Sequence, residues 1–153
     1  MNRFIAGIAF GIIALTATTA IGSSLLPSLS GKPQSWQPLA ADDLNDRIDR
    51  AIAAEAAWPQ KNPVQITLQL FGENLEEVRS AIVEMEKNRP EGADAATVNY
   101  IRDGFLDDSV RGDWHQLELQ RLPDRTWRVR NARVARRCWR GLNAAAYRSG
   151  PCP

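Results

Sequence analysis

Hydrophobic and polar side chains follow a clear period along most of the chain, and this period predicts the elements. Between residues 42 and 58, apolar side chains recur at intervals of three and four residues, as in an amphipathic helix. Residues 64–71 alternate strictly between apolar and polar side chains, which predicts a half-buried strand. Between residues 74 and 85 the helical spacing returns, and Asn74 with Glu77 has the arrangement of a capping box.

Three more strands are predicted in the second half of the chain, at residues 95–103, 110–122 and 126–137. In the second of these, His115 shares a face with leucines, which predicts a packing residue. In the third, the apolar side chains change from odd to even positions, which predicts a bulge near Asn131.

The predicted order of elements is therefore α-β-α-β-β-β. We expect an α+β fold in which two helices pack on one face of a four-stranded, mainly antiparallel sheet. In outline this fold is cystatin-like or NTF2-like, a comparison that rests on element order and implies no activity.

The first forty residues have the composition of an export segment and a linker. Residues 1–22 combine Arg3 with an apolar run and small residues, which is typical of a signal peptide. The apolar stretch 4–21 is also almost long enough to remain as an N-terminal membrane anchor. Residues 23–40 are rich in Pro, Ser and Gly and are predicted to be a flexible linker. We therefore expect an exported, periplasmic or extracytoplasmic protein whose α+β domain spans residues 41–153.

The chain has two cysteines, Cys138 and Cys152, and in an oxidising compartment a disulfide between them is expected. The bond closes a C-terminal cystine loop and stabilises the fold by about 3 kcal/mol on the chain-entropy model. With a single histidine in the chain, a zinc site lacks the other ligands that it needs, and we expect no cofactor.

Positive charge is concentrated at the C-terminal end, because residues 121–153 contain nine Arg and one acidic residue although the whole chain carries a net charge of +1. Guanidinium groups interleaved with aromatic rings are suited to binding anions. The expected partners are an acidic envelope protein, a glycan or lipid headgroups, and not nucleic acid. The alternatives are that the arginines pair with the acidic residues of the chain itself or protect a sheet edge. The candidate binding residues are Arg128, Arg130, Arg133, Arg136, Arg137, Arg140 and Trp139.

Four aspartates near the start of the strand predicted at residues 110–122 form a weaker candidate site, for calcium. This ion prefers several oxygen ligands on a flexible loop. They are Asp103, Asp107, Asp108 and Asp113. Their spacing does not match an EF-hand loop. The alternative is that they cap turns or pair with Arg102 and Arg111.

One string of residues resembles a known group of proteins. It runs Asp103-Gly104-x-x-Asp107-Asp108-Ser109-Val110-Arg111, and Trp127, Gly141 and the two cysteines follow it. It is similar to a group of small exported proteins, chiefly cyanobacterial, that have no assigned function. The resemblance covers roughly the last 60 residues. It implies export and the disulfide but supplies no catalytic residue. The cystine loop of that group carries a histidine, which this loop lacks.

Nucleophilic catalysis is not expected, because the chain has one histidine and no Gly-x-Ser-x-Gly motif. Asp107 or Asp108 with Glu118 could form a glycosidase-like carboxylate pair, but the sequence does not give the separation that such a pair needs. We therefore expect a non-enzymatic interaction module that uses the Arg- and Trp-rich C-terminal surface. The alternative is a small-ligand binder or hydrolase that uses the concave face of the sheet, in a pocket lined by Tyr100, Trp114 and Trp127.

Overall fold

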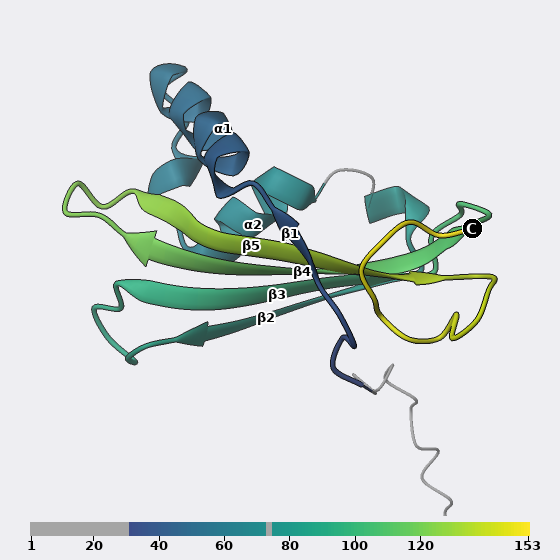
Figure 1. The fold of residues 1–153 in the computed structure, drawn as a ribbon. Coiled ribbons are helices and arrows are strands. Elements are labelled where there is room, and N and C mark those ends of the chain that lie inside the picture. Colours follow the sequence, from purple (N-terminus) through teal and green to yellow (C-terminus); the bar gives the residue numbers. More distant parts are fainter. Residues whose placement is uncertain (1–30, 73–74) are drawn as a thin grey trace, which may run out of the picture. The chain divides into compact units, whose positions relative to one another are not determined.

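The computed structural model describes residues 31–72 and 75–153, so the predicted signal peptide or anchor and the first part of the predicted linker lie outside the described residues. Two α-helices lie over one face of a five-stranded sheet (Figure 1). In chain order the elements are β1 (Gln37–Leu39), α1 (Ala41–Ala53), the 3-10 helix η1 (Trp58–Gln60), α2 (Pro63–Phe71), the 3-10 helix η2 (Leu75–Glu77), β2 (Ser80–Lys87), β3 (Ala95–Asp103), β4 (Val110–Arg121) and β5 (Trp127–Cys138).

The sheet has the strand order β1-β5-β4-β3-β2, and every neighbouring pair is antiparallel. The α+β class and the antiparallel sheet confirm the prediction, but the predicted number of four strands is wrong. The additional strand is β1, which lies within the segment predicted as a linker and pairs with residues 132–134 of β5. Three residues are too few to show an alternating pattern, so β1 leaves no signal in the sequence.

The segment 64–71, predicted as a strand, is the helix α2. Its start is marked by Asn62, whose side chain accepts a hydrogen bond from the backbone N–H of Gln65 at 2.9 Å, and by Pro63 at the first helical position. Ile66 and Leu70 lie one turn apart and are both buried. Alternate apolar residues include pairs four residues apart, so the same sequence fits both periods, and the start signal decides for the helix.

The segment 74–85, predicted as a helix, contains the 3-10 helix η2 and the greater part of the strand β2, and Asn74 lies outside the described residues. A helix with this spacing would bury Leu75 and Met85, which are instead 46% and 39% exposed. The strand shows period two, because Ile82 and Val83 are each partly buried on opposite faces of the sheet. The predicted succession of one helix, one strand and one helix is therefore two helices followed by a strand.

The three last strands confirm the predictions within one or two residues. Between Glu118 and Leu119 the register of β4 with β5 shifts, so that Arg130 is the extra residue of a bulge beside the predicted Asn131. The bulge keeps apolar side chains on the helix-covered face on both sides of it, with Val129 before and Ala132 after.

The main core lies between the two helices and the sheet, which confirms that both helices cover one face. The core consists of Leu44 and Ile48 of α1, Ile66 and Leu70 of α2, and Ala96, Val98, Leu117, Leu119, Trp127, Val129 and Ala132 of the sheet. α1 also binds the edge of β5 directly. The Asn45 side chain donates to the carbonyl of Val129 at 2.9 Å and accepts from its N–H at 3.0 Å, as a neighbouring strand does.

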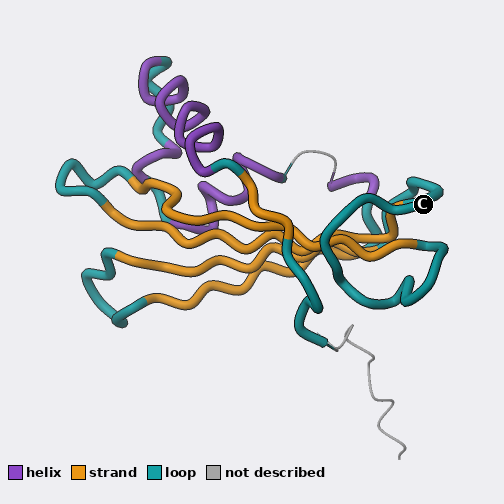
Figure 2. The backbone as a smooth tube through the Cα atoms, in the orientation of Figure 1, coloured by secondary structure: helices purple, strands orange, loops and turns teal. Residues whose placement is uncertain are grey.

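A second, smaller core lies on the other face of the sheet, at the end where the C-terminal loop folds back (Figure 2). Trp114 is its centre, with Trp36 and Tyr147 packed edge-on at 6.1 Å and 5.6 Å between ring centroids. The backbone N–H of Gln34 donates to the carbonyl of Tyr147 at 2.8 Å. The segment before β1 and the C-terminal loop therefore hold each other against this part of the sheet.

Candidate functional site

Most of the candidate arginines of β5 have partners within the domain. Arg128 pairs with Asp49 of α1 at 2.6 Å, and Arg136 donates to the side chain of Gln37 at 2.9 Å. Arg133 donates to the side-chain oxygen of Gln116 and lies over the ring of Trp36 at 4.5 Å. Each of these contacts joins β5 to another element.

Arg137 belongs to a part-buried ion-pair cluster with Asp103 and Arg111. It donates to both carboxylate oxygens of Asp103, and Arg111 approaches the same carboxylate at 3.3 Å. Burial raises the pKa of Asp103, but the hydrogen bond and charge of Arg137, aided by Arg111, outweigh it, so the pKa lies below its usual value. This cluster ties the end of β3 to β4 and β5.

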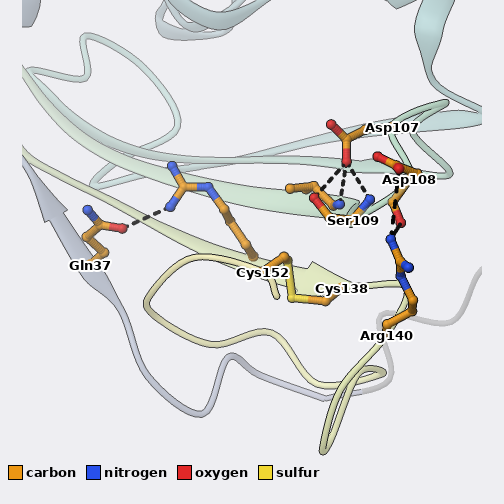
Figure 3. The surroundings of a disulfide bond; sticks show 9 residues. Gln37, Asp107, Asp108, Ser109, Cys138, Arg140 and Cys152 are labelled. Atoms are coloured by element: carbon orange, nitrogen blue, oxygen red, sulfur yellow. Dashed lines mark hydrogen bonds and ion pairs between the residues drawn. A yellow bond between two sulfur atoms is a disulfide. The ribbon is translucent and has the colours of Figure 1, made fainter.

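The acidic turn before β4 is held together by its own backbone. Asp107 accepts hydrogen bonds from the N–H groups of Ser109 and Val110 at 2.7 Å and 2.6 Å, and these bonds lower its pKa (Figure 3). Asp103 and Asp113 lie on opposite faces of the sheet, because their register partners are Gly112 and Arg102 respectively. The four aspartates are thus not brought together as one calcium site. Within residues 31–72 and 75–153, no group of three or more Asp, Glu, His or Cys side chains is placed to hold a metal ion.

A buried charged cluster, which the sequence pattern does not predict as a unit, lies on the helix-covered face. Arg102 donates to both carboxylate oxygens of Asp113 at 3.0 Å and 2.7 Å, and Nε2 of His115 lies 3.0 Å from Oδ2 of the same carboxylate. Burial raises the pKa of Asp113, but the bonds from His115 and Arg102 outweigh it and hold the pKa below its usual value.

Two polar atoms beside this cluster are buried without a hydrogen-bond partner among the described residues, the hydroxyl of Tyr100 and Nδ1 of His115. The sequence held one signal for the cluster. Asp113 stands at an inward position of β4, two residues before His115, where an apolar side chain is the rule.

Three candidates remain: Arg130, which is exposed at the bulge of β5, and Trp139 and Arg140, which lie on the C-terminal surface. Trp139 is 46% exposed, and the guanidinium of Arg111 lies over its ring at 5.1 Å. The backbone N–H of Trp139 donates to the carbonyl of Ser109 at 2.9 Å, and Arg140 donates to the carbonyl of Asp108 at 3.1 Å. The cystine loop and the β3–β4 turn are therefore bound side by side.

The cystine loop is closed as predicted by a disulfide between Cys138 and Cys152 (Figure 3). Two leucines on the joined loops are almost fully exposed, Leu106 at 83% and Leu142 at 87%. We call the group Leu106, Arg111, Trp139, Arg140 and Leu142 the distal surface.

The alternative pocket on the concave face does not exist at the predicted residues. Tyr100 is fully buried, and Trp114 and Trp127 are 8% and 5% exposed. Tyr100 and Trp127 point into the helix-covered face, whereas Trp114 points to the other face, beneath Trp36 and Tyr147. The three side chains therefore fill two cores and line no common cavity.

Searches of protein families, curated proteins and solved structures found no match to this chain. Among the residues that the structure describes, no helix is both long and apolar enough to cross a membrane.

Proposed function

We propose that this chain is a non-enzymatic interaction module of the cell envelope, which binds an acidic protein through the distal surface. The observation that carries the proposal is the half-exposed Trp139, stacked against Arg111 and fixed by a disulfide-closed loop. Trp and Arg are enriched among the residues that dominate the affinity of protein interfaces. A loop that is already ordered loses less entropy on binding than a free segment does.

Export to an oxidising compartment is part of the proposal. It is supported by the disulfide, which is rare in reducing compartments, and by the signal-like pattern of residues 1–22. We also propose that the chain is related to the small exported proteins that it resembles. We propose likewise that its fold is cystatin-like or NTF2-like in outline. The acidic character of the partner is supported by the distal surface itself, whose two charged residues, Arg111 and Arg140, are both cations.

The proposal assigns the arginines of β5 and the distal surface to different roles. Arg128 and Arg137 bind Asp49 and Asp103, so replacing them tests folding more than binding. Trp139 and Arg140 are exposed, at 46% for the whole of Trp139 and 67% for the side chain of Arg140, so replacing them alters the surface with little effect on the core.

The test is site-specific photo-crosslinking in cells, with a photoreactive amino acid at position 142. Position 122 is the matched control, because Leu122 is a 37% exposed leucine in the β4–β5 turn, at the other end of the sheet. We expect a discrete crosslinked partner from position 142 and none from position 122. The partner, once purified, should bind the Trp139→Ala variant about 30-fold more weakly, corresponding to about 2 kcal/mol.

Equal crosslinking at both positions, or no crosslinked partner at position 142, contradicts the proposal. So does a partner whose affinity is unchanged by both Trp139→Ala and Arg140→Gln. A melting temperature close to that of the unaltered chain confirms that each variant is folded.

A further inference from the structure

The face of the sheet opposite the helices is only partly covered. Register partners in neighbouring strands project to the same face, so the pairing assigns the side chains to rows. The row nearest the C-terminal loop is apolar and buried beneath Trp36 and Tyr147. The next two rows are polar. They consist of Glu84, Asn99, Gln116 and Arg133, and of Glu86, Thr97, Glu118 and Asn131.

A trough of about 550 Å³ lies over the second polar row, beside the β2–β3 turn. This volume is within the usual range for small-ligand sites. Its polar lining includes Glu86, Asn88, Thr97, Glu118, Gln120 and Arg130. The bulge at Arg130 contributes to this site, because it places an additional arginine beside the row instead of opposite a residue of β4.

The trough contains hydrogen-bond donors and acceptors that have no partner among the described residues. No described residue bonds to the carboxylates of Glu86 and Glu118, to the guanidinium of Arg130 or to the side-chain amide of Gln120. The backbone that carries these groups belongs to a paired sheet rather than to a loop. They therefore present acceptors and donors along one surface without first having to exchange internal partners.

The first polar row, next to the trough, is already ordered by internal hydrogen bonds. Asn99 accepts through its side-chain oxygen from Trp114 at 3.0 Å and from Gln116 at 2.8 Å. Gln116 in turn accepts from Arg133 at 2.8 Å. The side-chain oxygens of Asn99 and Gln116 are both engaged within the row. No described residue accepts a hydrogen bond from the side-chain amino group of Asn99, so this donor is available to a ligand. This row extends the donor surface beyond the trough.

This surface carries charges of both signs, and this decides the class of ligand. Glu84, Glu86 and Glu118 lie among or beside the guanidinium groups of Arg130 and Arg133. A polyanion or a polycation meets like charges at this surface, whereas a neutral molecule with many hydroxyl groups meets none. Each hydroxyl both donates and accepts, so it matches carboxylates and guanidinium or amide donors on one surface.

We propose that the trough binds a neutral oligosaccharide, whose hydroxyls donate to Glu86 and Glu118 and accept from Arg130 and Gln120. This site is separate from the distal surface and does not depend on the proposed protein partner.

The test is a calorimetric and NMR titration of the full-length chain with three neutral probes, the hexasaccharides of glucose with β-1,4 links, of glucose with α-1,4 links and of N-acetylglucosamine with β-1,4 links. We expect saturable binding of at least one probe, with shifts in the backbone signals of residues 95–97 and 118–120. Glu118→Gln removes the charge while preserving side-chain size, and should weaken binding about tenfold, as expected for the loss of a charge-assisted hydrogen bond.

Asp42→Asn is the matched control, because Asp42 is an exposed acidic residue on α1, on the helix-covered side of the sheet, and its replacement should leave the affinity unchanged. Trp139→Ala should also leave it unchanged, which separates this site from the distal surface. No saturable binding of any probe up to about 10 mM, the weakest range that such a site needs, overturns the proposal. So does equal binding by the Glu118→Gln variant, or preferential binding of a sulfated oligosaccharide that Arg130→Gln abolishes.

Discussion

Reduction of the Cys138–Cys152 disulfide should destabilise the domain by an amount that can be calculated from the loop that it closes. The cysteines are 14 positions apart, so the bond closes a loop of about fifteen residues. On the chain-entropy model, opening such a loop in the unfolded chain costs about 3 kcal/mol of stability at 25 °C. For a domain of this size the loss lowers the melting temperature by roughly 10 °C.

The fold itself should survive reduction, because other contacts hold the C-terminal loop. Arg136 and Arg148 exchange both of their backbone hydrogen bonds, at 2.8 Å and 2.9 Å. Tyr147 is buried against Trp114. We therefore expect an unchanged circular dichroism spectrum for the reduced chain and a transition at lower urea concentration.

The assay compares urea unfolding of the oxidised chain, of the chain reduced with a phosphine, and of the Cys138→Ala/Cys152→Ala variant. The phosphine should have no effect on the variant, which controls for its action on other groups. If reduction lowers the free energy of unfolding by less than about 1 kcal/mol, the loop-closure calculation is refuted. The unfolded chain must then be constrained by something other than the disulfide. A much larger loss in the variant than in the reduced chain assigns the difference to the packing of Cys138, which is 2% exposed.

Two further predictions concern the helix-covered side of the sheet. Asp113→Asn removes the part-buried carboxylate that accepts from both Arg102 and His115, and should cost about 3–5 kcal/mol in urea unfolding. A cost below about 1 kcal/mol contradicts the importance of this carboxylate. The pKa of Asp113 is lower in the folded chain than in the unfolded chain, so ionised Asp113 stabilises the fold. This stabilisation is fully present above the unfolded pKa near 3.9 and is lost as the pH falls through the folded pKa. On acidification the Asp113→Asn variant should therefore lose less stability than the unaltered chain. Asn45→Ala removes two hydrogen bonds to Val129 and should cost about 1–3 kcal/mol, with faster hydrogen exchange at the Val129 amide, and an unchanged exchange rate counts against the direct link between α1 and β5.

The sequence was sufficient for the last three strands because each is long and buried on one face. Nine to twelve residues of alternation distinguish a strand from a helix, and even the bulge of β5 was visible as a change of phase at Ala132. For the two segments before them, residues 64–71 and 74–85, the prediction exchanged helix and strand. In α2 the apolar residues fit both periods, and only the start signal of Asn62 and Pro63 distinguishes the helix from a strand.

The candidate site was predictable in composition but not in arrangement. The sequence shows which face of β5 an arginine occupies, but it does not show which acidic residue faces it. Asp49 and Asp103, the partners of Arg128 and Arg137, are far away along the chain and are brought near only by the packing of α1 and β3. The exposure of Trp139 depends on the path of the cystine loop, which has no periodic pattern.

The outer edge of β5 explains why the arginines are not needed as protection for the sheet. One edge of β5 pairs with β4 along its length, and three segments share the other edge. Asn45 binds it at Val129, β1 pairs with residues 132–134, and Arg148 pairs with Arg136. An edge that is already paired needs no charged residues to prevent the addition of a further strand. The arginines that have partners on this strand therefore position α1, β1 and β3, while Arg130, Trp139 and Arg140 remain exposed for contact with other molecules.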